Sequence, residues 1–134
     1  NDEMVQNLDF AQTFLEAAMI KAPDDMQGES LIPLLKGDPE KWNRDAVYYH
    51  YYEYPSVHMA KRHYGIVNKE FKLVHFYYDV DEWELYDRLK DPNEMNNVYN
   101  DPGYKEVVEK LTEELREIRI KYQDSEELDK SFIY

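Results

Sequence analysis

Apolar residues near the start of the chain recur at intervals of three and four positions. The positions with this spacing are Leu8, Ala11, Leu15 and Ala18, joined by Phe14. The spacing matches the roughly 3.6 residues of a helical turn, so it predicts an amphipathic helix from Met4 to Ala18. Asn7 or Asp9 is placed to cap its first turn. The apolar stripe of this helix has to be buried against the same protein or against another surface.

The pattern changes after Asp38-Pro39, where β-branched and aromatic residues become frequent. They form short runs separated by turn-forming sequences, a pattern that predicts strands. The predicted strands span residues 46–54, 62–67, 71–78 and 84–87. The turn Asn68-Lys69-Glu70 is short enough to join the second and third strands in a hairpin.

Helical spacing returns between Tyr104 and Tyr122, which predicts one long helix. A helix that follows four strands predicts an α+β fold. In it, a small four-stranded antiparallel sheet is packed by the long C-terminal helix and preceded by an N-terminal helical arm. We divide the chain into the arm (1–40), a sheet-and-helix domain (41–124) and a tail (125–134).

Composition and charge narrow the functions that the chain can serve. Its 134 residues fit one compact domain with an appended arm. The net charge of −13 repels phosphate backbones and anionic headgroups, so we expect neither nucleic acid nor membrane as a partner. Cysteine is absent, and no serine lies in a nucleophile-elbow motif. We therefore assign no catalytic residue to this chain. His58 and His63 could in principle bind a metal ion, but they lack a third ligand of obvious geometry, so we assign no metal ligand either.

Basic residues are concentrated in one part of this acidic chain. Residues 50–75 carry two acids against four bases and hold all four histidines. Within this range we select four candidate substrate-binding residues, His58, Lys61, Arg62 and His63. Guanidinium, ammonium and imidazole donors beside aromatic rings suit a sulfate, phosphate or carboxylate on a sugar. In the alternative interpretation, Lys61 and Arg62 form a solvated loop and His63 is a half-buried strand residue.

Several segments together resemble the C-terminal part of type I, formylglycine-dependent sulfatases. They are Gln27–Gly37, Arg62–Ile66, Phe71–Val74, Glu84–Asp87 and Asp91–Asn97, in the order and spacing of that family across about residues 5–122. The chain is most similar to bacterial sulfatases that process sulfated polysaccharides. The resemblance implies that Asn7–Met19 is the last helix of a large catalytic domain, and that a smaller C-terminal subdomain begins near Ala46. The family's helix usually ends in Ala-Gly, whereas this chain has Met19 at the glycine position.

Enzymes of this family hydrolyse sulfate esters with a formylglycine and a calcium ion. The formylglycine is made from the first residue of a (Cys/Ser)-x-Pro-x-Arg motif, and Ser30 is followed by Ile32 at the proline position. The resemblance therefore implies that the nucleophile and the calcium ligands lie outside this chain, so we expect the isolated chain to be inactive as a sulfatase. It also implies that the His58–His63 loop helps to bind a sulfated carbohydrate, and that the protein is periplasmic or secreted.

The arm and the resemblance together indicate two partners, the remainder of the catalytic domain and a second copy of this chain. The remainder of the catalytic domain would cover the apolar stripe of the arm. Without that domain, the arm would fold back on the small sheet, pair with a second copy or fray, and we rank a homodimer through the arm ahead of fraying. The competing function is a stand-alone carbohydrate- or protein-binding module. A (Cys/Ser)-x-Pro-x-Arg motif upstream in the reading frame would distinguish the two.

Overall fold

The computed structural model describes residues 1–132. The chain divides between Val47 and Tyr48 into two compact units. The helices are α1 (Asp9–Ala17), α2 (Ile32–Leu35), α3 (Lys105–Lys121) and α4 (Glu126–Ser131), and the strands are β1 (Ala46–Tyr51), β2 (His63–Asn68), β3 (Phe71–Phe76) and β4 (Glu82–Asp87). Within residues 1–132, no helix combines the length and the apolar character needed to cross a membrane.

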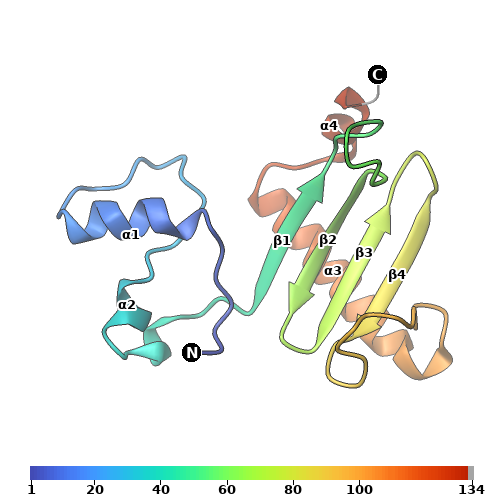
Figure 1. Cartoon of the computed structure of the whole chain (residues 1–134), viewed down its shortest axis with the longest axis horizontal. Coiled ribbons are helices and arrows are strands. Elements are labelled where there is room, and N and C mark those ends of the chain that lie inside the picture. The colour runs from blue at the N-terminus through green and yellow to red at the C-terminus, as the bar shows by residue number, and fades with distance from the viewer. Residues whose placement is uncertain (133–134) are drawn as a thin grey trace. The chain divides into compact units, whose positions relative to one another are not determined.

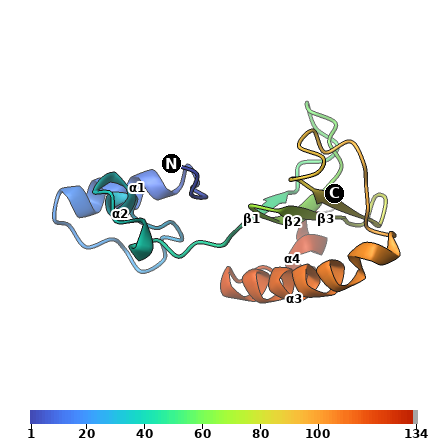
Figure 2. The same ribbon diagram turned by 90° about the horizontal axis from the view of Figure 1, so that it is seen from below.

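The second unit is built on a four-stranded sheet with the order β1-β2-β3-β4. β2 pairs with β3, and β3 with β4, in antiparallel register. The arrows of β1 and β2 also point in opposite directions (Figure 1). α3 runs along one face of the sheet (Figure 2). The predicted α+β fold is therefore confirmed, with its antiparallel sheet, its long helix and its N-terminal helix.

The core of the second unit lies between the sheet and α3. Strand pleating places alternate residues on one face, and the register aligns Ile66, Leu73 and Leu85 across three strands. Each of the three is at most 1% exposed. Leu111 and Leu115 of α3 are buried as well, and they lie one helical turn apart. The helical spacing in the sequence therefore identified the buried side of α3.

The ends of all four strands differ from the sequence prediction, those of β2 by one residue each. β1 stops at Tyr51 instead of residue 54, and β4 begins at Glu82, two residues earlier than predicted. β3 stops at Phe76 instead of residue 78. Tyr78 has a φ of 64°, a conformation that cannot continue a strand. The aromatic runs thus located the strands, but not the points where they end.

α1 begins and ends differently from the helix that the sequence predicts. It starts at Asp9 instead of Met4, and its N-cap residue, Leu8, makes no side-chain cap hydrogen bond. The prediction that Asn7 or Asp9 caps this helix is therefore wrong, because the carboxylate of Asp9 is bound elsewhere in the first unit. At the other end, Met19 has a φ of 58°, the left-handed conformation that glycine favours. Methionine thus adopts the backbone conformation expected of the family's glycine.

α1 buries its polar side. The side chains of Asp9, Gln12 and Thr13 are buried, whereas Phe10 and Phe14 are 53% and 69% exposed. The hydroxyl of Thr13 accepts a hydrogen bond from the amide of Leu31 and donates one to the carbonyl of Asp9. Hydrogen bonds to polar side chains therefore hold this unit together, and the apolar stripe of α1 remains exposed.

Residues 125–134, which we separate as a tail, contain the short helix α4. Its N-cap is Ser125, whose hydroxyl accepts a hydrogen bond from the amide of Leu128. The ring of Phe132, just after the helix, stacks on Tyr52 with 4.3 Å between ring centres. The last two residues of the predicted tail lie outside the described residues.

Candidate functional site

The four predicted substrate-binding residues lie on the segment that leads into β2. His58 is exposed, and Lys61 is half-buried. The Nζ atom of Lys61 donates a hydrogen bond to the hydroxyl of Tyr54 at 2.5 Å and lies 3.8 Å from the centre of its ring. An aromatic ring therefore holds this ammonium group in place near the surface.

Arg62 lies in a different environment, because its side chain is buried. It is 2% exposed, and its Nη1 donates a hydrogen bond to Asp79 at 3.0 Å. The rings of Tyr54 and Tyr78 lie 5.7 Å and 5.9 Å from its guanidinium carbon. Its Nε has no hydrogen-bond partner in the part of the chain that the structure describes. The charge of Arg62 is therefore balanced by Asp79, and the ion pair connects this loop to the β3–β4 turn.

His63 is half-buried at the start of β2. Its Nδ1 lies 2.7 Å from the carbonyl oxygen of Lys61, and its ring stacks on Tyr51 with 5.5 Å between centres. The structure thus places Lys61, Arg62 and His63 on one short segment, with His58 exposed, Lys61 and His63 half-buried, and Arg62 buried. Substrate binding by these residues stays a prediction.

Reasoning from the sequence missed three residues that surround this segment: Tyr54, Tyr78 and Asp79. Tyr78 is 65% exposed, and its positive φ is uncommon for a large side chain. The sequence does contain a run of tyrosines up to Tyr54, but their spacing does not show which of them leave the sheet. We refer to Tyr54, Lys61 and Tyr78, together with the Arg62–Asp79 pair, as the loop surface.

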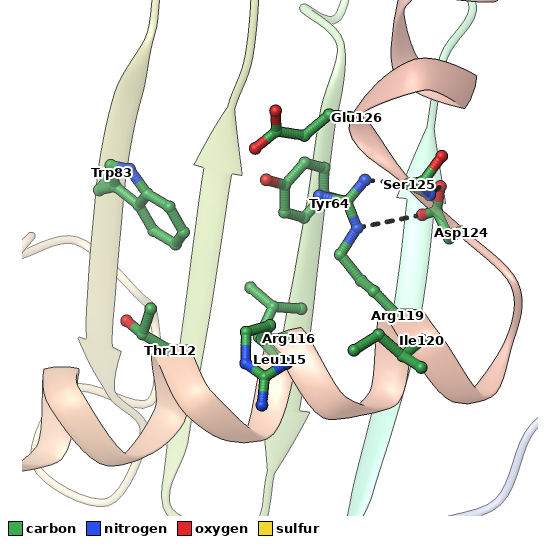
Figure 3. Close-up of a pocket in the computed structure, with 10 residues that line it drawn as sticks. All are labelled: Tyr64, Trp83, Thr112, Leu115, Arg116, Arg119, Ile120, Asp124, Ser125 and Glu126. Atoms are coloured by element: carbon green, nitrogen blue, oxygen red, sulfur yellow. Dashed lines mark hydrogen bonds and ion pairs between the residues drawn. The ribbon is translucent and has the colours of Figure 1, made fainter.

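A second cluster of ionisable side chains joins β1, the end of α3 and α4. The Nδ1 of His50 lies 3.1 Å from Asp124, and its Nε2 lies 2.7 Å from the hydroxyl of Tyr77. Arg119 donates to both carboxylate oxygens of Asp129 at 2.9 Å. Its side chain extends from α3 past Tyr64 towards Asp124 (Figure 3). This network ties α4 to the rest of the second unit.

Burial and neighbouring charges set the protonation of this cluster. Burial would raise the pKa of Asp124, but the hydrogen bond from Tyr48 and the charge of Arg119 outweigh it and hold the pKa below 3.8. Burial raises the pKa of Asp129 above its ordinary value despite its bond to Arg119. Burial also lowers the pKa of His50, although both carboxylates oppose this shift. A neutral imidazole beside a guanidinium–carboxylate pair is therefore the favoured state at neutral pH.

These side chains do not fit the calcium ion that the family implies. Among residues 1–132, one grouping has three side chains suited to a metal ion, namely His50, Asp124 and Asp129, whose ligand atoms lie within 4.8 Å of one another. Arg119 already supplies the cation there, 2.9 Å from Asp129 and 3.4 Å from Asp124. Calcium takes roughly six to eight oxygen ligands, which this grouping does not provide. The cluster is therefore a structural network.

Comparison with known proteins gives the family of the chain. The family described as N-sulphoglucosamine sulphohydrolase, C-terminal, matches residues 1–121. The chain is 47% identical over 130 residues to the N-acetylglucosamine-6-O-sulfatase of Bacteroides thetaiotaomicron, covering 95% of the chain and 23% of that protein. It is 32% identical over 102 residues to the Delta 4,5-hexuronate-2-O-sulfatase of the same bacterium, covering 75% of the chain and 21% of that protein.

The fold is also similar to a solved structure, that of a protein in complex with its substrate D-glucosamine-2-N,6-O-disulfate. The two share 49% identity and a TM-score of 0.83, over 88% of this chain and 24% of the other. The chain thus spans about a quarter of the length of the relatives it matches. The resemblance found in the sequence is confirmed, and the chain belongs to the C-terminal family of the N-sulphoglucosamine sulphohydrolases, a part of sulfatases.

Proposed function

We propose that this chain is the C-terminal part of a sulfatase that acts on sulfated carbohydrate, and that it contributes to recognition of the substrate. The similarity to sulfatases over 95% of the chain supports this assignment. Catalysis would be carried out by residues outside these 134, because the sequence has neither a cysteine nor a serine that begins the formylglycine motif. We place the calcium ligands in that outside part as well.

The environment of Lys61 is the observation that best supports the proposed role in recognition. Its ammonium group is held near the surface by Tyr54, and no ion pair within residues 1–132 includes it. An ammonium group beside aromatic rings suits a sulfate group on a sugar, with the rings of Tyr54 and Tyr78 available to contact the sugar. We assign the contact with sulfate to Lys61 and His58. Arg62 and His63, which are bonded within the protein, would support the shape of the loop.

Lys61→Gln in the longer sulfatase that contains this chain is expected to lower kcat/KM for a sulfated oligosaccharide about tenfold. The variant removes one charge-assisted hydrogen bond, worth ~1.5–3 kcal/mol. Lys105→Gln is the matched control, because Lys105 is an exposed lysine of α3. Equal kinetics in the two folded variants would contradict the proposed contact. The isolated chain, assayed in parallel, is expected not to turn over an aryl sulfate.

We also propose that the rest of the polypeptide covers the apolar side of α1. Phe10 and Phe14 are exposed large apolar residues, and burial of each would contribute ~1.5–3 kcal/mol. In the isolated chain we expect this side to pair with a second copy, so Phe14→Glu should shift sedimentation from dimer towards monomer. Leu89→Glu, at an exposed apolar residue of the second unit, should not. A monomer at high concentration before any substitution would contradict this pairing.

A further inference from the structure

A cavity of about 340 Å³ lies beside α4 in the second unit. Its walls come from β2, β3, the β3–β4 turn and α4. The aromatic lining residues are Tyr64, His75, Tyr77 and Tyr78, and the charged ones are Asp81, Glu126, Asp129 and Lys130. Sites for small molecules are roughly 300–1,000 Å³ and combine aromatic walls with a few polar groups. The cavity therefore has the size and the lining of a site for one small molecule.

The aromatic walls of this cavity suit contact with a cation. Tyr64 and Tyr77 are buried, and their ring centres lie 5.6 Å apart. Tyr64 already contacts one organic cation of the protein, because the guanidinium carbon of Arg119 lies 3.7 Å from the centre of its ring. The faces of aromatic rings attract cations through their quadrupole. Tyr78, exposed and held at a positive φ, extends this aromatic surface outward.

The charges around the cavity leave one negative charge unbalanced. Arg119 is bonded to Asp129 and also lies 3.4 Å from Asp124, which does not line the cavity. We count its charge against that of Asp129, to which it is closer. The remaining lining charges are those of Asp81, Glu126 and Lys130, two negative and one positive. Oδ1 of Asp81 lies 3.1 Å from Nε2 of His75, and histidine is counted as neutral at pH 7. No ion pair in the described part of the chain includes Glu126. Its side chain lies near the ring of Tyr64 (Figure 3). The site therefore favours a ligand with a single positive charge.

We propose that this cavity binds a small primary amine in its protonated form. The carboxylates of Glu126 and Asp81 supply the opposite charge, and the rings of Tyr77 and Tyr78 contact the carbon atoms next to the ammonium group. An anion would meet excess negative charge. A metal ion would need converging ligand atoms, and within residues 1–132 neither Glu126 nor Asp81 belongs to such a group.

The test is an NMR titration of the chain with n-butylamine and with D-glucosamine, both protonated at neutral pH. Butan-1-ol and N-acetylglucosamine are their neutral counterparts. Amides of residues 77–81 and 126–130 are expected to shift with at least one amine, and its neutral counterpart should bind about fivefold more weakly. The amine that binds more tightly shows whether the site prefers an alkyl chain or a sugar. Absence of binding by both amines, or equal binding of the neutral compounds, would overturn the proposal.

Three variants test whether the charges act as described. Glu126→Gln should weaken amine binding about two- to fivefold, and Lys130→Gln should strengthen it by a similar factor. Glu117→Gln, on an exposed part of α3 outside the cavity, should leave it unchanged. The same affinity in all three variants would overturn the proposal. n-Butylamine carries neither sulfate nor a sugar ring, so the outcome with this probe is independent of the proposed sulfatase function.

Discussion

Asp9→Asn is expected to destabilise the first unit by about 3–5 kcal/mol, because it removes one partner of a buried ion pair. Asp9 is 0% exposed, and its carboxylate accepts hydrogen bonds from Nη1 and Nη2 of Arg44 at 2.5 Å and 2.8 Å. It also accepts hydrogen bonds from the amides of Gln6 and Glu29. The substitution would leave the charge of Arg44 buried without its main partner. Because these bonds join α1 to two distant segments, the whole unit should be affected.

The pKa of Asp9 in this ion pair also indicates how the stability of the first unit should change in acid. Burial would raise the pKa of Asp9, but the hydrogen bonds from Arg44, Glu29 and Gln6 outweigh it and lower the pKa below 3.8. A carboxyl group with a lowered pKa in the folded state stabilises that state above its unfolded pKa. The contribution is lost as the pH falls through the lower, folded value. Asp9→Asn should therefore be less stable at neutral pH and less sensitive to acid.

Trp42 provides the measurement for Asp9→Asn. It is buried in the first unit, and the guanidinium carbon of Arg44 lies 4.8 Å from its ring centre. In a Trp83→Phe background, its fluorescence during urea unfolding reports this unit alone. The control is Asp24→Asn, whose ion pair with Lys21 is exposed and worth less than about 1 kcal/mol. Equal unfolding midpoints for the two variants would show that the buried ion pair is not needed for the stability of the first unit.

The sequence was most informative where elements are packed by apolar contacts. The spacing of Leu111 and Leu115 marked the buried side of α3 because that side faces a sheet of the same unit. α1 has an equally regular stripe, but the structure buries its polar side. The reason is the pair between Asp9 and Arg44, which are 35 residues apart. Periodicity describes local spacing and does not reveal a distant ion partner.

The same limit applies to the candidate site. Residue type and local charge selected the segment with Lys61 and Arg62, and the structure places the two in different environments. Arg62 is buried and paired with Asp79, a residue that follows it by 17 positions, after two strands and the turn between them. The hydroxyl of Tyr54 holds Lys61, because the chain leaves β1 and turns back before β2. Both contacts depend on how the strands are paired, which residue composition does not determine.

Arg119→Leu is expected to destabilise the second unit by about 3–5 kcal/mol at neutral pH. Arg119 is 8% exposed. It supplies the positive charge next to the carboxylates of Asp124 and Asp129, whose side chains are also mostly buried. Leucine fills part of the volume but leaves both negative charges without a cation. The contact between the guanidinium and the ring of Tyr64 is lost as well. α4 should be affected first, because Asp129 connects it to α3.

The pH dependence of Arg119→Leu separates lost charge pairing from lost packing. Burial acts to raise the pKa of both Asp124 and Asp129, and Arg119 opposes this effect. Without the cation, the pKa values of both carboxyl groups should therefore rise. Carboxyl groups with raised folded pKa values destabilise the fold when they are ionised and stop doing so once they are protonated. The loss relative to the parent protein should therefore be larger at pH 7 than at pH 5. A packing defect alone would be the same at both values.

Urea unfolding followed by Trp83 fluorescence in a Trp42→Phe background measures this difference. Arg116→Leu is the matched control on the same helix, because Arg116 pairs with Glu113 and both side chains are more than half exposed. Its loss of stability should be small and the same at both pH values, because solvent screens this exposed pair. Adding Asp129→Asn to Arg119→Leu should restore part of the stability at pH 7, since it removes one of the two unpaired charges. No restoration, together with equal losses at pH 5 and pH 7, would mean that Arg119 stabilises the unit through packing rather than through its charge.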